Sequence, residues 1–382
     1  MPWHETKPMS ERSRFIALYE ERLFTMSELC ARFGIARKTG YKWLARYQEA
    51  GLPGLADHSR APHTCPHRLR PQVEAALLKA RAAHPTWGPK KLVAFLQRRQ
   101  PDLVLPAPST VGELLRRQGL TQPRGSRRPR QSGGAGPLRA DTPNAVWCAD
   151  FKGEFRTLDG RWCYPLTITD AHSRFLLACQ ALPSPQYDGA QGVFARLFAE
   201  YGLPQAIRTD NGAPFATTAW GGLSQLSVGW LKLGVGHQRI TPGKPQENGS
   251  HERMHRTLKA ETTRPPGADQ AAQQARFEAF RGEFNQERPH EALGQQPPAL
   301  HYRASERACP LQVRPPQYPR HWGVRRVGPS GCFRFHSRHV FLSSVLIGEE
   351  IGLEEVGEGI WSVYLYDRLL ARFDAENGRL YG

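Results

Sequence analysis

Apolar residues near the start of the chain recur every three or four positions, which is the spacing of amphipathic helices. The segment "ERSRFIALYEERLF" predicts a first helix. A short second helix is predicted after it, because Thr25 and Glu28 form the pattern of a capping box and Gly34 ends the segment. A third helix is predicted from about Ala36. Two short helices around a tight glycine turn predict a helix-turn-helix domain in residues 1–55.

The third helix places cations where a DNA-binding helix makes its contacts. Arg37, Lys38 and Lys42 lie in its first two turns, from which side chains reach base edges and phosphates. We expect these residues to bind DNA. An ordinary small helical bundle would show the same apolar spacing, and Gly40 is an unusual residue inside a recognition helix.

A second helical domain with a further helix-turn-helix is predicted in residues 66–120. Its last segment, "PSTVGELLRRQGL", has Ser109 as the expected cap and Gly119 at its end.

Residues 121–140 are rich in Gly, Pro, Ser and Arg and predict a basic linker. Arg127 and Arg128 are its candidate phosphate contacts. A linker without DNA contacts would have a similar composition.

The pattern after the linker predicts an α/β core in residues 141–305. "AVWCADFKGEF" and "CYPLTITDAHSRFLLACQAL" predict three strands, with a turn near His172. Segments with helical spacing follow, among them about 219–233 and 269–286, together with two short strands. Strands first and alternation later predict a mixed sheet with flanking helices on both faces.

Proline-rich residues 297–318 predict a second linker. Five short strand-like runs follow it, "GVRRV", "CFRFHSRHVFL", "EIGLEEV", "IWSVYLY" and "LLARFD". They predict a small all-β barrel in residues 320–382. The expected fold class is therefore multidomain: α-helical domains, an α/β core and an all-β barrel.

Charge narrows the class of partner. The chain of 382 residues has 52 Lys and Arg against 35 Asp and Glu, a formal charge of +17, which favours a polyanion such as DNA. Its seven cysteines include no Cys-x-x-Cys pair, which fits a reducing cytoplasm and a protein at the nucleoid. No apolar run approaches the 18 residues of a membrane span, so we expect no membrane partner.

Isolated acids at strand positions stand out in so basic a chain. Asp150 lies inside a predicted strand, and Asp210 ends another in "IRTDNG". The residues between them allow the two strands to be neighbours, and two adjacent carboxylates repel each other unless they bind cations. Oxygen ligands suit Mg²⁺ or Mn²⁺, and a third carboxylate would complete a site for two ions that act on phosphodiesters. For Asp210 alone, a turn cap is the simpler interpretation.

The segment "TPGKPQENGSHERMHRTLKAE" offers three candidates for the third carboxylate. Glu261 lies nine residues after Glu252, about 900° around a helix, and so faces the opposite side, where it would pair with a cation. Glu247 precedes the regular helix. Glu252 shares its face with Arg256 and with Lys259, a candidate phosphate contact. A simple ion pair between Glu252 and Arg256 is the alternative.

Together, "WCADFKG", "RTDNGAPF", "TPGKPQENGSHERMHRTLKAE" and, at 284–302, "FNQERPHEALGQQPPALHY" resemble the catalytic core of DDE transposases of bacterial insertion sequences, the branch related to retroviral integrases. The resemblance implies an RNase H-like fold for the core and an SH3-like barrel after it. It implies that Asp150, Asp210 and Glu252 hold two divalent metal ions. The spacing from Asp210 to Glu252 exceeds that of retroviral integrases, and we attribute this to the insertion "AWGGLSQLSVGW".

The same resemblance implies an activity. The enzyme would bind the terminal inverted repeats of its element, cleave at the ends and join the 3′-hydroxyls to target DNA, as a homo-oligomer on double-stranded DNA. Three alternatives stay open. A non-enzymatic helix-turn-helix regulator would leave the three acids unexplained. An RNase H-type nuclease would not need two helix-turn-helix units, and an inactive transposase copy is the third.

Overall fold

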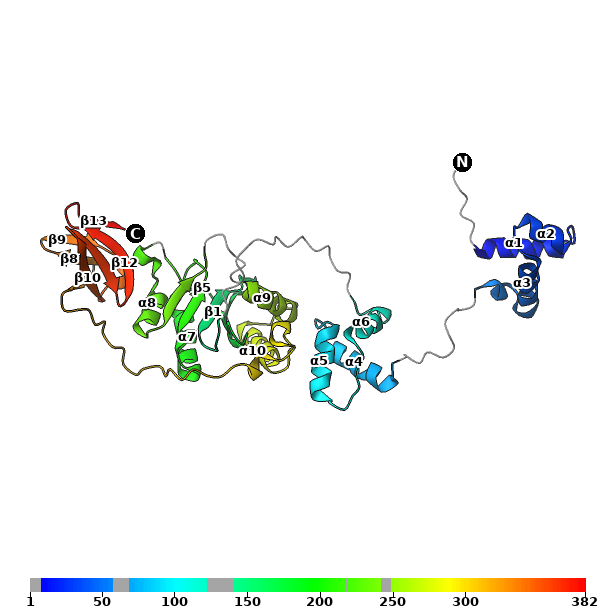
Figure 1. Cartoon of the computed structure of the whole chain (residues 1–382), viewed down its shortest axis with the longest axis horizontal. Helices are drawn as coiled ribbons and strands as arrows, with labels where there is room; N and C mark the ends of the chain where they lie inside the picture. The colour runs from blue at the N-terminus through cyan, green and yellow to red at the C-terminus, as the bar shows by residue number, and fades with distance from the viewer. Residues whose placement is uncertain (1–7, 58–68, 122–139, 218, 242–248) are drawn as a thin grey trace. The chain divides into compact units, whose positions relative to one another are not determined.

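The computed structural model describes residues 8–57, 69–121, 140–217, 219–241 and 249–382 (Figure 1). The chain divides into two compact units, Met1–Arg68 and Leu69–Gly382, and each is described by itself. None of the described helices is long and apolar enough to cross a membrane.

The first unit is a small helical bundle. Its elements are α1 (Pro8–Glu20), α2 (Met26–Arg32), α3 (Arg37–Ala50) and the 3-10 turn η1 (Leu52–Leu55). The predicted capping box is present, because the Glu28 N–H donates to the Thr25 hydroxyl at 3.3 Å and the Thr25 N–H donates to the Glu28 carboxylate at 2.8 Å. The predicted pair of helices around Gly34 is confirmed.

Gly40 has a packing role in this unit. It is buried in α3, where a Cβ atom would lie 2.6 Å from the Cys30 sulfur and 3.0 Å from both the Met26 sulfur and the Phe15 ring. Only glycine therefore lets α3 approach α1 and α2 this closely. This requirement explains the unusual residue that the sequence shows inside the predicted recognition helix.

The second unit begins with three further helices. These are α4 (Pro71–Ala83), α5 (Pro89–Arg99) and α6 (Pro108–Arg117), packed around the fully buried Trp87. Ser109 is not the cap that we predicted: Ala107 occupies that position, and Pro108 opens the helix where its missing N–H costs no hydrogen bond. Gly119 follows the end of the helix at φ 67°, as predicted.

A six-stranded mixed sheet forms the core of this unit. Its strands are β1 (Val146–Phe151), β2 (Phe155–Arg156), β3 (Trp162–Asp170), β4 (Leu176–Leu182), β5 (Ala206–Thr209) and β6 (Gly236–Arg239). Their order is β2-β3-β1-β5-β6, with β4 also paired to β3. The strands β1, β3 and β4 are antiparallel neighbours, whereas β5 is parallel to β1 and β6 is parallel to β5.

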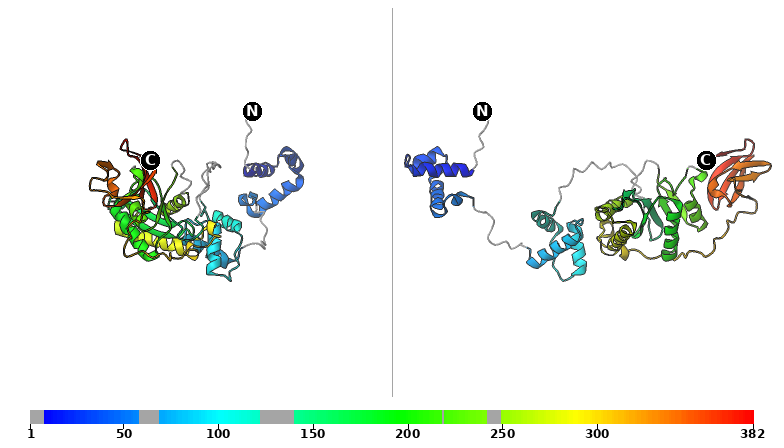
Figure 2. Two further views of the ribbon diagram at one scale, coloured as in Figure 1. Left: turned by 60° about the vertical axis from the view of Figure 1, so that its left-hand side comes forward. Right: turned by 180° about the vertical axis from the view of Figure 1, so that it is seen from behind.

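Helices cover both faces of the sheet, as predicted, and Figure 2 shows the arrangement from two further directions. They are α7 (Tyr187–Tyr201), α8 (Gln225–Lys232), α9 (Gly249–Thr262) and α10 (Gln270–Gln286). Side chains of α7 and α8 pack with Leu166 and Ile168 in one apolar cluster. Side chains of α9 and α10 pack with Leu176 and Cys179 in another.

The predicted helix over residues 219–233 begins later, at Gln225. Gly221 and Gly222 before it have φ of 68° and 64°, which helices do not contain. A Cβ on Gly221 would lie 3.0 Å from Leu370 of the C-terminal domain. Farther along, Val228 and Leu231 belong to the apolar core of that domain. The glycine-rich segment and α8 therefore pack against the C-terminal domain.

The C-terminal domain is antiparallel. Its strands are β7 (Gly323–Arg326), β8 (Cys332–Phe335), β9 (Arg338–Phe341), β10 (Glu350–Gly357), β11 (Ile360–Leu365), β12 (Arg368–Asp374) and β13 (Arg379–Tyr381). Five of them form a sheet in the order β13-β12-β11-β10-β7, and β8 pairs with β9 alone. The single strand predicted for "CFRFHSRHVFL" was wrong, because the chain turns at His336, with φ 51°, between β8 and β9.

The proline-rich segment after the core is fastened to the core at its start. The Tyr302 ring stacks on Phe175 with ring centroids 4.3 Å apart. The Ser305 N–H donates to the Tyr201 carbonyl at 2.8 Å, and the Leu203 N–H donates to the Arg307 carbonyl at 2.7 Å. The first residues of this predicted linker therefore pack against the core.

Candidate active site

The register of the sheet places Asp150 and Asp210 at the same level of neighbouring parallel strands. Cys148 of β1 is paired with Arg208 of β5, and each aspartate lies two residues farther along its chain. Side chains two residues apart share a face of a strand, and adjacent strands are about 4.8 Å apart. Asp150 and Asp210 therefore both lie at the carboxyl ends of these strands, where sheets of this kind bind ligands.

Asp150 lies in a crowded anionic environment. Its side chain is 19% exposed. Burial, followed by repulsion from Asp210 and Glu252, raises the pKa of Asp150 to about 7, although the Phe151 N–H and Lys152 act in the opposite direction. Both other predicted acids therefore lie close enough to oppose its ionisation. A bound cation would relieve this repulsion.

Helix α9 carries Glu252 beside this position. Its buried side chains recur at helical spacing and are His251, Met254, His255, Leu258 and Thr262. Glu252 follows the first of them and is exposed. The helix therefore packs through one face and leaves the carboxylate at the edge of the packed face.

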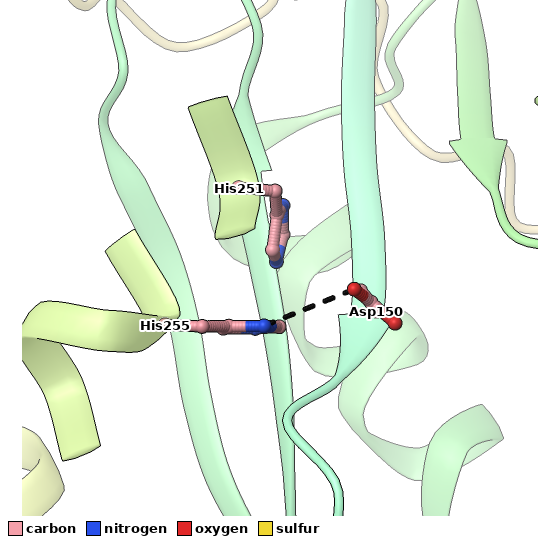
Figure 3. Close-up of side chains that lie close together, drawn as sticks. All are labelled: Asp150, His251 and His255. Carbon is pink, nitrogen blue, oxygen red and sulfur yellow. Dashed lines mark ion pairs between the residues drawn. The ribbon is translucent and has the colours of Figure 1, made fainter. Parts of the chain in front are cut away.

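Two buried histidines hold α9 on the sheet, and the sequence analysis missed them (Figure 3). The Nε2 atoms of His251 and His255 both lie 2.6 Å from the hydroxyl oxygen of Thr167, the residue opposite Asp150 in β3. Burial lowers the pKa of His251 to about 3, and burial, then His251 and Lys152, lower the pKa of His255 to about 2. Both rings are therefore neutral. The available signal was a pair of histidines four residues apart on a predicted helix.

Thr167 connects Asp150 to both histidines. Its hydroxyl donates to the main-chain carbonyl of Asp150 at 3.1 Å, and the Nε2 atoms of both histidines lie within hydrogen-bond distance of the same hydroxyl. The His251 Nδ1 lies 3.2 Å from the Thr169 hydroxyl. The His255 Nδ1 lies 3.8 Å from the Asp150 carboxylate. A dashed line marks this pair in Figure 3.

These contacts decide which side chains could hold a metal ion. Within the described part of the chain, Asp150, His251 and His255 are the group whose ligand atoms lie within 4.8 Å of one another. Both ring nitrogens of His251 lie within hydrogen-bond distance of threonine hydroxyls, so neither is available to bind a metal ion. The carboxylates of Asp150, Asp210 and Glu252 supply the oxygen donors that Mg²⁺ and Mn²⁺ prefer, and the raised pKa of Asp150 fits a cation there.

The structure also shows the contacts of the other candidate acids. The Glu261 carboxylate pairs with Arg288 at 2.8 Å, but both side chains are largely buried, at 18% and 8% exposed, so Glu261 is not a solvated acid. Asp210 accepts from the Gly212 N–H at 3.2 Å and therefore also caps its turn. Across the described residues, no ion pair joins Glu252 to Arg256.

The predicted DNA-binding residues that the structure describes are all exposed. Arg37, Lys38 and Lys42 project from α3, and the Lys42 Nζ lies 4.6 Å from the centre of the Trp43 ring. Lys259 is exposed on α9. Arg127 and Arg128 of the predicted linker, and Glu247 before α9, lie outside the described residues.

Family models match the two helical regions and the core. One model of a homeodomain-like domain matches residues 7–56, and a second model of a homeodomain-like domain matches residues 39–115. Two models of the integrase core domain match residues 140–245 and 233–298, which include Asp150, Asp210 and Glu252. The chain carries an integrase core domain. The fold class expected from the sequence, with helix-turn-helix regions before this core and an antiparallel domain after it, is confirmed.

Relatives of this integrase core occur in viruses and in a bacterial insertion element. The Gag-Pol polyprotein of baboon endogenous virus (strain M7) is 26% identical over 205 residues, which cover 51% of this chain and 11% of the polyprotein. The uncharacterized protein of insertion element IS476 from Xanthomonas euvesicatoria is 28% identical over 169 residues, which cover 42% of this chain and 45% of that protein. The match thus spans less than half of either relative.

Solved structures similar to this chain are integrases at low sequence identity. The HTLV-2 integrase catalytic core domain in complex with magnesium is 15% identical, with a TM-score of 0.35 over 43% of this chain and 100% of that chain. The integrase of a simian T-cell lymphotropic virus intasome, in complex with the PP2A regulatory subunit B56 gamma, is 15% identical, with a TM-score of 0.39 over 77% of this chain and 97% of that chain.

Proposed function

We propose that this integrase-core protein is a DNA transposase that cleaves the ends of an insertion sequence and joins the freed 3′-hydroxyls to target DNA. The observation that supports the proposal is that three acids influence one another at the carboxyl end of the sheet. Asp210 follows β5 at the level of Asp150 in β1, and repulsion from Asp210 and Glu252 contributes to the raised pKa of Asp150. Helix α9, which two histidines anchor on β3, carries Glu252. A regulator that only binds DNA has no use for this arrangement.

The three acids would share one task in the proposed reaction, which is to bind metal ions. Asp150, Asp210 and Glu252 would hold two Mg²⁺ or Mn²⁺ ions. When bound, such ions activate an attacking water or 3′-hydroxyl and stabilise the leaving oxygen of a phosphodiester. Thr167 would position Asp150, because its hydroxyl donates to the Asp150 carbonyl and contacts both histidine rings. Lys259, exposed on α9, would contact a DNA phosphate.

The remaining domains serve recognition in this proposal. Residues 1–55 and 66–120 bind the terminal inverted repeats, the 121–140 linker follows the phosphates, residues 141–305 carry the chemistry, and residues 320–382 bind DNA or another subunit. Two ends must be cut together, so the protein works as a homo-oligomer on DNA. The six cysteines in the described part of the chain are free thiols, which suits a place in the cytoplasm at the nucleoid.

Metal dependence tests the proposed chemistry. Purified protein and DNA that carries the terminal repeats should give cleaved and joined products with Mg²⁺ or Mn²⁺ and none with a chelator. Strand-transfer products on a gel separate this activity from that of a nuclease, which would give cleavage alone. Full activity in chelator would contradict the two-metal site, and binding without any cleavage would favour the regulator or an inactive copy.

A second prediction concerns the exposed cations of α3. Replacing Arg37, Lys38 and Lys42 together by alanine should weaken binding to terminal-repeat DNA by roughly tenfold or more for each lost base contact, and binding to random DNA by less. Fluorescence anisotropy at fixed salt measures both affinities. Arg14→Ala, an exposed cation on α1, is the matched control and should change neither. Equal losses of affinity for both DNAs would show that these residues contact phosphates only. No loss of affinity would show that α3 does not contact the bases.

A further inference from the structure

A second charged site lies next to the carboxylates, in a cavity of about 240 Å³. It is lined by Lys91 of α5, Arg174 of the turn between β3 and β4, Arg253 of α9, and Arg288 and His290 after α10. Among the described residues, Glu291 is the one acid in the lining. The described lining therefore carries more cations than acids.

The cations are close enough to repel one another. Burial, followed by repulsion from Arg288 and, more weakly, from Arg253, lowers the pKa of Lys91 to about 8, although Glu261 and Glu291 act in the opposite direction. Burial, followed by Lys91, Arg288 and Arg174, lowers the pKa of His290 to about 3. Like charges brought together in a partly buried place cost free energy, and an anion between them would remove that cost.

The neighbouring acids are already engaged elsewhere. Glu291 pairs with Lys90 at 3.2 Å, and both side chains are exposed. Glu261 pairs with Arg288 at 2.8 Å but does not line the cavity. Neither carboxylate therefore fills the cavity, while the His290 Nε2 has no hydrogen-bond partner among the described residues.

The lining also includes hydroxyl groups suited to an oxyanion. Ser250, Arg253 and Thr257 line the cavity at helical spacing on one face of α9. Arg253 is exposed, so the cavity is open to solvent on that side. Arg253 follows Glu252 directly, so the same helix presents an acid to the catalytic cluster and a cation to the cavity.

The cavity also joins two parts of the second unit. Lys91 lies on α5 of the second helical region, whereas the other three cations belong to the core. Around it, polar contacts join the two parts, since His84 lies 3.0 Å from the Glu283 carboxylate and Arg99 lies 3.1 Å from that of Glu287. An anion bound to Lys91 and Arg253 at once would add a further bridge.

We propose that this cavity binds one backbone phosphate of the DNA and thereby clamps the second helical region onto the core beside the active site. The proposal rests on the proposed function for its choice of DNA as the source of the phosphate. It assigns to Arg253 and Lys91 a binding role separate from metal chemistry. DNA that engages the helical region would in this way also fix α9, which carries Glu252.

Inorganic phosphate is the first probe of the site, used with the full chain and without divalent ions. At constant ionic strength, replacing chloride by phosphate should raise the unfolding temperature of the wild type by linkage to binding. Arg253→Gln and Lys91→Met should lose most of that rise. In chloride, Arg253→Gln should be no less stable than wild type, because it removes one of several crowded cations, whereas Lys91→Met also loses the hydrogen bond from Lys91 to the Pro289 carbonyl. Arg196→Gln, an exposed cation on α7, should keep the full rise. An equal rise in all four proteins would overturn the site.

The second arm distinguishes DNA from free phosphate. Terminal-repeat duplexes with one neutral methylphosphonate linkage at each position in turn are bound by wild type and by Arg253→Gln. One linkage should weaken wild-type binding about tenfold, the effect of a lost charge-assisted contact, and leave Arg253→Gln unaffected. If no linkage shows this coupling, the DNA phosphate is excluded. Asp150→Asn should lose affinity at the same linkage as wild type. Loss of the proposed chemistry can therefore be distinguished from loss of phosphate binding.

Discussion

Asp150→Asn and Asp210→Asn should each reduce end cleavage and strand joining by roughly a thousandfold or more. A metal ion contributes several kcal/mol of charge stabilisation, and each 1.36 kcal/mol is a factor of ten in rate. The substitutions keep the shape of the side chain and remove its charge. Binding to terminal-repeat DNA should survive, because neither carboxylate is needed to hold a polyanion. Initial rates of joining and binding isotherms on the same DNA give both quantities.

Stability provides the control for Asp150. Its folded pKa, about 7, lies above its unfolded value, so without metal ions its contribution to stability is full below about pH 4 and is lost as the pH rises through about 7. Asp150→Asn should lack this loss and should unfold no earlier than wild type at pH 8. An Asn variant that loses activity only because it unfolds would contradict the catalytic assignment, as would one that keeps near-normal joining.

Glu252→Gln should also reduce joining by roughly a thousandfold or more, for the same reason of a lost metal ligand. The side chain is exposed, so the substitution should leave the unfolding temperature unchanged. Glu261→Gln is the matched control, because it is the same change on the same helix. It should remain active but unfold at a lower temperature, since Arg288, 8% exposed, loses the charge of its partner.

The two glutamates are therefore separated by opposite outcomes. Thermal unfolding and joining rates of the two variants, measured side by side, decide between them. A Glu252→Gln protein with near-normal turnover would disprove its role as third ligand. So would an intact Glu261→Gln protein without activity.

The histidine pair explains how so exposed a glutamate keeps its place. His251 and His255 flank Glu252 in sequence and share one hydroxyl, that of Thr167 opposite Asp150. The position of Glu252 relative to Asp150 thus depends on buried contacts between α9 and β3. Their low pKa values keep both rings neutral, so these contacts do not change near neutral pH.

What the sequence determined by itself was mainly local. The capping box of Thr25 and Glu28, the helices on either side of Gly34 and the strands β1, β3 and β4 each follow from residues a few positions apart, whereas the short strand β2 was not predicted. The backbone hydrogen bonds of a helix or a turn join near neighbours, so their signals are readable in short windows. The acids at the strand ends were visible for the same reason.

The sequence pattern was misleading in three places. Ser109 matched a cap pattern, but its neighbour Pro108 opens the helix. The segment over residues 219–233 had helical spacing, yet Gly221 has a φ of 68° and lies where a Cβ would be 3.0 Å from Leu370. Gly40 looked unfavourable until the packing of α1 and α2 against it was known.

Only the tertiary structure decided how the candidate site is put together. The register that puts Asp150 level with Asp210 comes from the pairing of β1 with β5, about sixty residues later. The contact of Thr167 with His251 and His255 joins residues 84 and 88 positions apart. The cationic cavity collects Lys91, Arg174, Arg253 and Arg288 from four segments. Such contacts depend on how whole elements pack, and no short-range periodicity in the chain encodes them.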